Sequence, residues 1–226
     1  MSGPYYQDDL VTLYHGDCLE ITEWLAADVL VTDPPYGIDW LTRGTYGPRG
    51  YTGKAVETKH AIRGDDGVHG RDAAIKLWGN GPRIVFGSWR IPRPDPVDHR
   101  LIWHKAGSPP GPLRAAFMSQ DEEIYITGSG FLKTSPPLRS VIKTNEHRPS
   151  EVVRVGHPTP KPVGLMEILI ATTTGSVADP FAGSGATLIA ARNLGRRSIG
   201  VELEERYCEL IAKRLSQQAF DLGDIA

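Results

Sequence analysis

The sequence predicts an α/β fold in which a mostly parallel sheet is covered by helices on both faces. The clearest pattern lies in the C-terminal part, where strand, helix, strand and helix alternate at 176–178, 186–194, 198–203 and 204–218. This alternation is typical of parallel strands joined by helical crossovers. Short apolar runs at 28–33 and 83–86 predict further strands that are buried on both faces.

The remaining elements follow from hydrophobic period and from the glycines and prolines that bound them. The expected strands cover 10–15, 100–105, 123–127 and 152–155, and the expected helices cover 19–25, 72–78 and 162–171. Pro162 suits the first turn of its helix, where the missing N–H costs no hydrogen bond.

Two irregular segments, 37–72 and 131–156, interrupt this order. The first is polar, has no sustained period, and is long enough that a structureless loop there is usually functional or mobile. At 226 residues the chain has the size of one domain. We therefore expect a single domain, 1–226, with two inserted loops.

Charge is distributed unevenly around a net value of −2. Residues 1–38 hold seven acidic side chains and no Lys or Arg, whereas 83–114 and 131–163 each hold six basic and two acidic side chains. Such a basic middle supplies either a local phosphate-binding face or a solvated loop surface. Charge alone favours the solvated surface.

Composition excludes several classes of protein. No stretch approaches the ~18 apolar residues of a membrane span, and the N-terminus lacks the layout of a signal peptide. Cys18 and Cys208 are too few for a disulfide framework or a four-ligand zinc site. We expect an intracellular protein without a metal.

A rigid turn ends the strand at 28–33. Proline has no N–H and fixes φ, so Asp33-Pro34-Pro35-Tyr36 stops the strand and displays a carboxylate, free carbonyls and a ring. We call these four residues the elbow. Ligands of open α/β sheets bind beyond the carboxyl ends of the strands, yet an ordinary surface turn explains the elbow equally well on its own.

A second constellation joins Gly183-Ser184-Gly185, here the glycine turn, to Glu202. Glycines between a strand and a helix let the backbone approach a ligand, and an acid one strand later accepts hydrogen bonds from ribose hydroxyls. A phosphate-binding loop is disfavoured because no Gly-Lys-Ser/Thr follows, and a dinucleotide site because the third glycine is missing. The combination favours an adenosine moiety.

Three motifs in this chain order resemble the beta class of amino-group DNA methyltransferases, which use S-adenosylmethionine. They are the elbow, His157–Pro162, and Asp179–Gly185. The likeness extends to Gly16-Asp17-Cys18, Phe86-Gly87-Ser88 and Gly200-Val201-Glu202, and covers most of the chain outside 37–72 and 131–155. It implies a Rossmann-like methyltransferase fold with circularly permuted motif order, the catalytic motif preceding the cofactor motif.

The resemblance also implies roles for individual residues. The methionine part of the cofactor would be lined by Asp179, Phe181, Gly183 and Gly185, with Thr159 and Lys161 close by. Glu202 would hold its ribose, and Asp17 would reach its adenine. The full implied cofactor set is Asp17, Cys18, Asp33, Thr159, Lys161, Asp179, Pro180, Phe181, Gly183, Gly185 and Glu202.

The implied catalytic residues are those of the elbow: Asp33, Pro34, Pro35 and Tyr36. Asp33 and the Pro34 carbonyl would accept hydrogen bonds from an exocyclic amine, and Tyr36 would stack on the flipped base. An aspartate at the first position goes more often with adenine N6, so we expect site-specific N6-adenine methylation of DNA. An N4-cytosine enzyme, an RNA amino-methyltransferase and an inactive nucleic-acid-binding relative stay open as alternatives.

Double-stranded DNA is the implied partner, held by the two inserted loops through Arg43, Arg49, Lys54, Arg139 and Lys143. The region before His157 is shorter than the recognition region usual in the family, and Pro160 stands where Gln or Glu is more common. A homodimer and a cognate restriction enzyme remain open as partners, and the implied location is the cytoplasm, as for prokaryotic or phage-encoded enzymes.

Overall fold

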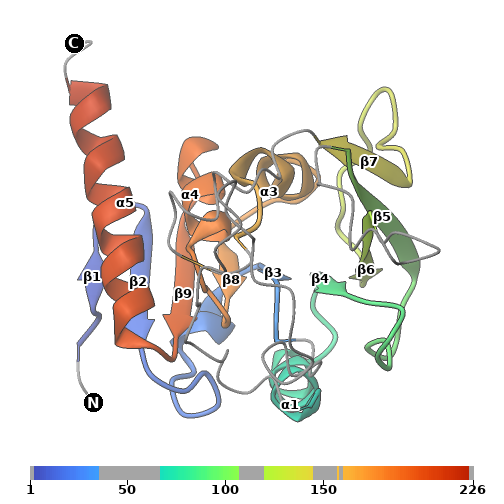
Figure 1. The fold of residues 1–226 in the computed structure, drawn as a ribbon, viewed down its shortest axis with the longest axis horizontal. Coiled ribbons are helices and arrows are strands. Elements are labelled where there is room, and N and C mark those ends of the chain that lie inside the picture. Colours follow the sequence, from blue (N-terminus) through green and yellow to red (C-terminus); the bar gives the residue numbers. More distant parts are fainter. Residues whose placement is uncertain (1–2, 36–66, 107–119, 145–156, 158–159, 224–226) are drawn as a thin grey trace, which may run out of the picture.

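The structure, a computed structural model, describes residues 3–35, 67–106, 120–144, 157 and 160–223. Its centre is a nine-stranded sheet with the strand order β1-β2-β9-β8-β3-β4-β6-β5-β7 (Figure 1). The strands are β1 Tyr6–Gln7, β2 Val11–His15, β3 Val29–Thr32, β4 Arg83–Gly87, β5 His99–Lys105, β6 Asp121–Thr127, β7 Val141–Thr144, β8 Val177–Asp179 and β9 Ser198–Glu202. Five of the eight strand pairs are parallel, which confirms the predicted mostly parallel sheet.

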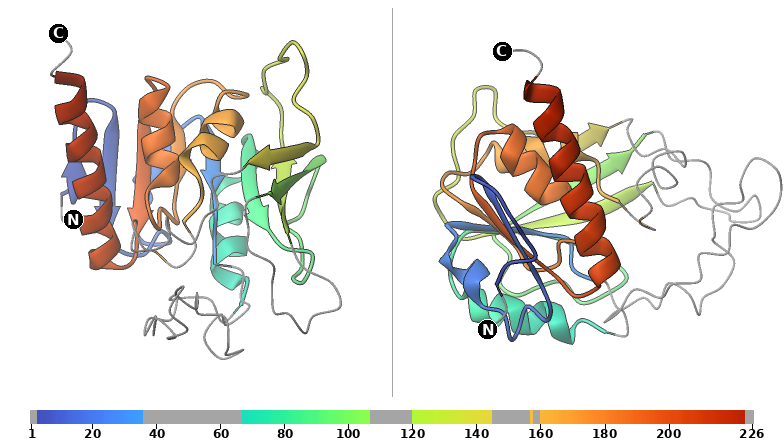
Figure 2. Two further views of the ribbon diagram at one scale, coloured as in Figure 1. Left: turned by 45° about the horizontal axis from the view of Figure 1, so that its top comes forward. Right: turned by 90° about the vertical axis from the view of Figure 1, so that its left-hand side faces the viewer.

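Helices cover both faces of this sheet, as predicted. They are α1 His69–Trp78, α3 Val163–Ile170, α4 Ala186–Asn193, α5 Glu205–Gly223 and the 3-10 helix η1 Glu23–Ala26. Figure 1 and Figure 2 show α3, α4 and α5 on one side of the sheet and α1 on the other. None of the helices in the described part of the chain combines the length and apolar character that a bilayer crossing needs.

Strand β3 shows how alternation builds the two layers. Successive side chains of a strand point to opposite faces. Val29 and Val31 accordingly pack in one apolar cluster with residues of α3 and α4, whereas Leu30 packs in another with Trp24 of η1 and Ala74 of α1. Burial on both faces explains why this strand is an uninterrupted apolar run.

The structure corrects several predicted elements in the N-terminal half. The helix expected at 19–25 is reduced to η1, which is preceded by a single turn in which the Asp17 carbonyl accepts hydrogen bonds from the N–H groups of Glu20 and Ile21 at 3.0 and 2.8 Å. Strand β1, of only two residues, had no sequence signal. The predicted loop 37–72 is too long at its end, since α1 begins at His69.

Corrections in the second half concern β7 and the ends of helices. Strand β7 lies inside the predicted loop 131–156; its four residues alternate between exposed and buried, a signal too short to separate from a loop. Pro162 is extended and precedes α3, which therefore begins at Val163. The strand expected at 152–155 lies outside the described residues.

One edge of the sheet collects the ends of strands that run in different directions. Strands β2, β9, β8, β3 and β4 are mutually parallel, so their carboxyl ends share this edge. Strand β6 is antiparallel to β4, with Glu123 opposite Gly87, and therefore begins there. Strands β5 and β7 end at the same edge, where Lys105 pairs with Thr144. We call it the active edge.

Strand β7 is held by a buried hydrogen bond, which gives a stability prediction. Trp103 is fully buried and its Nε1 donates to Thr144 Oγ1 at 2.9 Å. Thr144→Val removes this acceptor from a buried donor, so we expect the free energy of unfolding to fall by about 1–3 kcal/mol. Urea denaturation measures the change. Val141→Thr, on the exposed side of the same strand, should stay within about 0.5 kcal/mol of wild type; equal losses in both variants would contradict the role of this bond.

Candidate active site

The elbow begins where β3 reaches the active edge. All four residues of β3 are buried, and the last, Thr32, donates its hydroxyl to Asp179 Oδ1 at 2.7 Å. Pro34 is buried directly after it, while Asp33 and Pro35 are half-buried. Because two prolines follow the aspartate, the ladder cannot continue, and the carboxylate stands at the strand end. Tyr36 lies outside the described residues.

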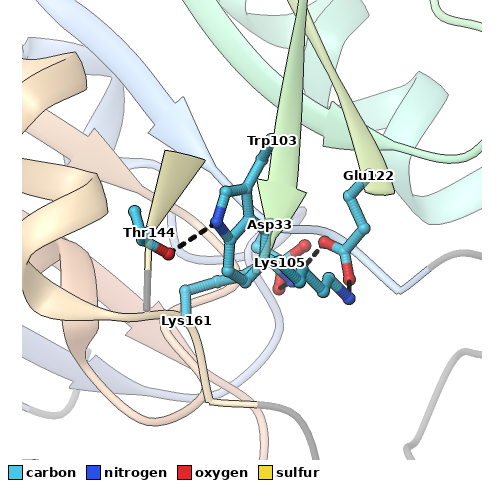
Figure 3. A network of polar contacts seen from close by, with 6 residues as sticks. All are labelled: Asp33, Trp103, Lys105, Glu122, Thr144 and Lys161. Carbon is cyan, nitrogen blue, oxygen red and sulfur yellow. Dashed lines mark hydrogen bonds and ion pairs between the residues drawn. The ribbon is translucent and has the colours of Figure 1, made fainter. Parts of the chain in front are cut away.

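The Asp33 carboxylate is ion-paired to Lys161. The Lys161 ammonium donates to Asp33 Oδ2 and lies 3.2 Å from Glu122 Oε2 (Figure 3). It also lies 5.1 Å from the centroid of the Phe86 ring. Its side chain is only 7% exposed. The Lys161 side chain thus contacts the expected amine acceptor, a contact that sequence reasoning, which placed Lys161 near the cofactor, did not anticipate.

Two further residues extend this pair into a chain of alternating charge. Glu122 Oε1 accepts from Lys105, whose ammonium lies 4.9 Å from the centroid of the Trp103 ring (Figure 3). We call Asp33, Lys161, Glu122 and Lys105 the charge network. Sequence reasoning missed Glu122 and Lys105. The one available signal was a charged pair at the ends of two expected neighbouring strands.

Burial and pairing oppose each other within the network. Burial disfavours the Lys161 ammonium, but the Asp33 and Glu122 carboxylates outweigh it and raise the pKa of Lys161. Burial also disfavours the Glu122 carboxylate, yet Lys161 and Lys105 outweigh it and lower the pKa of Glu122 to about 2. Both groups are therefore charged at neutral pH, which preserves an ionised partner for Asp33.

The glycine turn connects β8 to α4. Asp179, buried at the end of β8, accepts the Phe181 N–H at 3.2 Å as well as the Thr32 hydroxyl. Gly183 and Gly185 have φ of +52° and +78°, conformations that disfavour other residues. A Cβ on Gly185 would also lie 2.9 Å from Ile211 Cγ1. Close packing and backbone conformation together explain the glycines.

Glu202 faces this turn from the neighbouring strand end. Its Oε2 accepts the Gly183 N–H at 2.7 Å and its Oε1 accepts the Glu204 N–H at 2.8 Å. Burial raises the pKa of Glu202 to about 7, although both backbone donors oppose that change. Burial likewise raises the pKa of Asp179 to about 6, against hydrogen bonds from Thr187 and Thr32. Two buried acids therefore flank the turn.

His157 packs against the glycine turn from the other side. Its ring centroid lies 4.6 Å from that of Tyr207, and a Cβ on Gly183 would come 3.3 Å from its Nε2. Burial, helped by Lys161, Arg206 and Arg214, lowers the pKa of His157 to about 3, so the ring is neutral. Thr159 lies outside the described residues, and Pro160 is buried.

The remaining expected cofactor residues follow β2 and β8. Asp17 is exposed, one residue after Gly16, whose N–H donates to the Glu202 carbonyl at 2.9 Å. Asp17 is therefore close to Glu202 along the active edge. Cys18 is buried, and burial raises the pKa of its thiol to about 12, which makes it a packing residue. Pro180 is buried and Phe181 half-buried beside the turn.

The two expected DNA-binding residues within the described part of the chain differ in position. Lys143 is exposed on β7, opposite His104 and one residue from the active edge. Arg139 is also exposed but precedes β7, about 17 Å of extended chain from Thr144. Arg43, Arg49 and Lys54 lie outside the described residues. Among the residues that the structure describes, no group of three potential metal-ligating side chains is found.

The chain is similar in sequence to known DNA methyltransferases. The family model described as DNA methylase, for enzymes acting at N6 or N4, matches residues 88–214. The type II methyltransferase M.ScaI of Streptomyces caespitosus is 26% identical over 98% of this chain and 86% of its own length.

Solved structures share the fold. The DNA methyltransferase PvuII, described as cytosine-N4-specific, has a TM-score of 0.67 at 16% identity and covers 93% of this chain and 88% of its own. The complex of M1.HpyAVI with SAM has a TM-score of 0.60 at 23% identity and covers 91% of this chain and 100% of its own. The expected Rossmann-like methyltransferase fold is thereby confirmed.

The hydrogen bond from Thr32 to Asp179 predicts how the pKa of Asp179 changes when the hydroxyl is removed. Because the Thr32 hydroxyl stabilises the Asp179 carboxylate, Thr32→Val should raise the pKa of Asp179 above about 6, by about 1 on the pH scale. Carbon-13 NMR titration of the Asp179 carboxyl group measures it. Thr12→Val, the same change on β2, serves as the control. An Asp179 that titrates at the wild-type pH in Thr32→Val would rule out this contribution.

Proposed function

The chain belongs to the family of N6/N4 DNA methylases, and from this membership we propose that it methylates the exocyclic N6 of adenine in DNA, with S-adenosylmethionine as methyl donor. At the coarser level it is a DNA amino-methyltransferase. The finer proposal, adenine, rests on the aspartate that begins the elbow. The observation that supports methyl transfer at this place is the position of Asp33 beside Asp179 and the glycine turn, since Thr32 and Asp179 are bonded across neighbouring strands.

The residues around the glycine turn fit the nucleoside part of such a donor. A carboxylate offers about four acceptor positions, so the two backbone bonds of Glu202 leave room for both ribose hydroxyls. Those hydroxyls are donors to an ionised acid, so cofactor binding would favour the deprotonated form of Glu202. The positive φ of Gly183 and Gly185 favours glycine at both positions, so neither residue projects a side chain from the turn.

The elbow supplies the other half of the reaction. When bound, S-adenosylmethionine supplies an electrophilic methyl group on a sulfonium. The lone pair of a base amine is delocalised into the ring, so the amine is a weak nucleophile. Acceptance of its hydrogens by Asp33 and the Pro34 carbonyl would favour a pyramidal nitrogen and direct its lone pair at the methyl group. Positioning and electrostatic stabilisation then lower the barrier.

The ion pair with Lys161 favours the form of Asp33 that this step needs, the ionised carboxylate. Because the ammonium beside it stabilises the ionised carboxylate, Asp33 acts as a hydrogen-bond acceptor. Each carboxylate oxygen can accept more than one hydrogen bond, so pairing with Lys161 is compatible with accepting the amine. Tyr36 would stack on the extruded base and offset part of the cost of unstacking it.

Adenine is preferred over cytosine because the elbow begins with aspartate. N4-cytosine methylation is the second candidate, since the family includes both activities and the PvuII enzyme described as cytosine-N4-specific shares the fold. The same elbow would also suit an amine in RNA. M.ScaI is a type II methyltransferase, and by analogy the proposal extends to a cognate restriction enzyme.

The decisive experiment analyses the product of Asp33→Ala and wild-type protein. With labelled S-adenosylmethionine and duplex DNA, wild type should yield N6-methyladenine, and Asp33→Ala should lose transfer by at least about 10²–10³-fold because an acceptor for the reacting amine is gone. Nucleoside mass spectrometry identifies the base. Asp9→Ala, at an exposed acid away from the active edge, should keep full transfer. N4-methylcytosine as the sole product would refute the adenine assignment.

DNA contact is expected to be stronger at Lys143 than at Arg139, since Lys143 is beside the active edge. Lys143→Glu should weaken duplex binding and reduce the slope of log affinity against log salt by about 1, as expected when one phosphate contact is lost. Arg139→Glu should change the slope less. Fluorescence anisotropy over a salt series compares them, and identical slopes in wild type and Lys143→Glu would exclude that contact.

A further inference from the structure

The charge network contains an acid with no role in the proposed reaction, Glu122. We propose that Glu122 is a positioning residue for Asp33: through Lys161 it holds the amine acceptor charged and in place. This inference rests on the proposed function, because it assigns Asp33 as the acceptor. Glu122 itself belongs to β6, whereas Asp33 follows β3, and β4 lies between these strands in the sheet.

The geometry places Lys161 between two carboxylates. Its ammonium donates to Asp33 Oδ2 and lies 3.2 Å from Glu122 Oε2 (Figure 3). Lys161 stands between Pro160 and Pro162, and the helix begins at Val163, so its backbone has little freedom. Glu122 and a stiff backbone therefore restrict the position of the ammonium, and the ammonium in turn restricts the Asp33 carboxylate.

Glu122 is itself fixed from the far side. Its other oxygen, Oε1, accepts from Lys105, and Trp103 lies directly opposite Glu122 in the β5–β6 pair. The Lys105 ammonium lies over the Trp103 ring, whose Nε1 is anchored on Thr144 of β7. A change in the position of β5 or β7 would therefore alter the position of the Asp33 carboxylate, because Lys105, Glu122 and Lys161 connect them by successive ion pairs.

The charges explain why the second acid is needed. A single carboxylate beside a buried ammonium must offset its whole desolvation cost, and removal of one partner of a buried pair leaves the other uncompensated. With Glu122 present, Lys161 has two anionic partners, and Lys105 in turn balances Glu122. Asp33 can then share the ammonium and still accept the amine.

Two other ionisable groups, His157 and Asp179, lie near Lys161 and Asp33. His157 precedes Lys161 in the same segment, is neutral, and is influenced by the Lys161 charge. Asp179, bonded to Thr32, lies on the other side of Asp33, whose negative charge contributes to the raised pKa of Asp179. Glu122 differs from both in that its carboxylate is ion-paired with the Lys161 ammonium, as is that of Asp33.

Glu122→Gln tests the proposal, because it keeps the shape of the side chain and removes its charge. The matched control is Glu123→Gln, the next residue of β6, whose buried carboxylate pairs instead with Arg100 at 2.8 Å and with Tyr125. Single-turnover methyl transfer should fall roughly ten-fold or more in Glu122→Gln, with cofactor affinity within about two-fold. Glu123→Gln should transfer at the wild-type rate.

Two pH-dependent readouts separate positioning from a merely structural role. Loss of one carboxylate should lower the pKa of Lys161, so the alkaline limb of the transfer rate should move to lower pH in Glu122→Gln alone. Nitrogen-15 NMR of the Lys161 ammonium, assigned with Lys161→Arg, should show the same change without any substrate. Lys105→Met, which removes a neighbouring cation, should move the Lys161 titration in the opposite direction, and it serves if Glu122→Gln does not fold.

The outcomes are distinguishable from failure of the proposed function. If wild type transfers no methyl group to DNA, that function fails, and the NMR titration still decides whether Glu122 controls Lys161. An unchanged Lys161 titration in Glu122→Gln, or equal rate losses in Glu122→Gln and Glu123→Gln, would overturn the proposal. A shifted titration with a loss confined to Glu122→Gln would support it.

Discussion

The ion pair between Lys161 and Asp33 is the interaction on which the arrangement of the active edge depends. A buried ammonium is costly unless it is paired and hydrogen-bonded, and at 7% exposure the Lys161 side chain needs such partners. Each charge in the network has an oppositely charged neighbour. The Glu122 carboxylate balances the charge of Lys161, the Lys105 ammonium balances that of Glu122, and the Trp103 ring lies against Lys105. Four neighbouring charges are thus satisfied by one another, in a region bounded by β3, β5, β6 and the segment before α3.

Sheet topology makes that network possible. A purely parallel sheet would bring only carboxyl ends to the active edge, whereas the reversal at β6 brings an amino end there too. Glu122 reaches the edge because it is near the start of its strand, and Lys105 because it ends the next one. The antiparallel part of the sheet therefore contributes the charges that contact the elbow, while the parallel part carries the elbow and the glycine turn.

The two halves of the site meet at neighbouring strands that are far apart in sequence. Asp33 follows β3 and Asp179 ends β8, and the Thr32 hydroxyl joins them. Beyond Asp179, Glu202 orders the glycine turn through the Gly183 N–H. A donor methyl group and an acceptor amine would therefore approach across a single strand-to-strand boundary, which suits direct transfer between two bound molecules.

Local sequence alone determined the α/β class, the parallel C-terminal unit, the elbow and the glycine turn with Glu202. These depend on signals within a few residues: buried apolar runs, two consecutive prolines, and glycines between strand and helix. Only the tertiary structure decided that Lys161 pairs with Asp33, that Glu122 and Lys105 join them, and that Lys143 rather than Arg139 lies beside the active edge. Those facts depend on register between strands and on contacts over as many as 128 residues, and burial changes the energy of a charge only after the chain has folded. For the site residues outside the described part of the chain, the roles that the family resemblance implies stay predictions; these residues are Tyr36, Thr159, Arg43, Arg49 and Lys54.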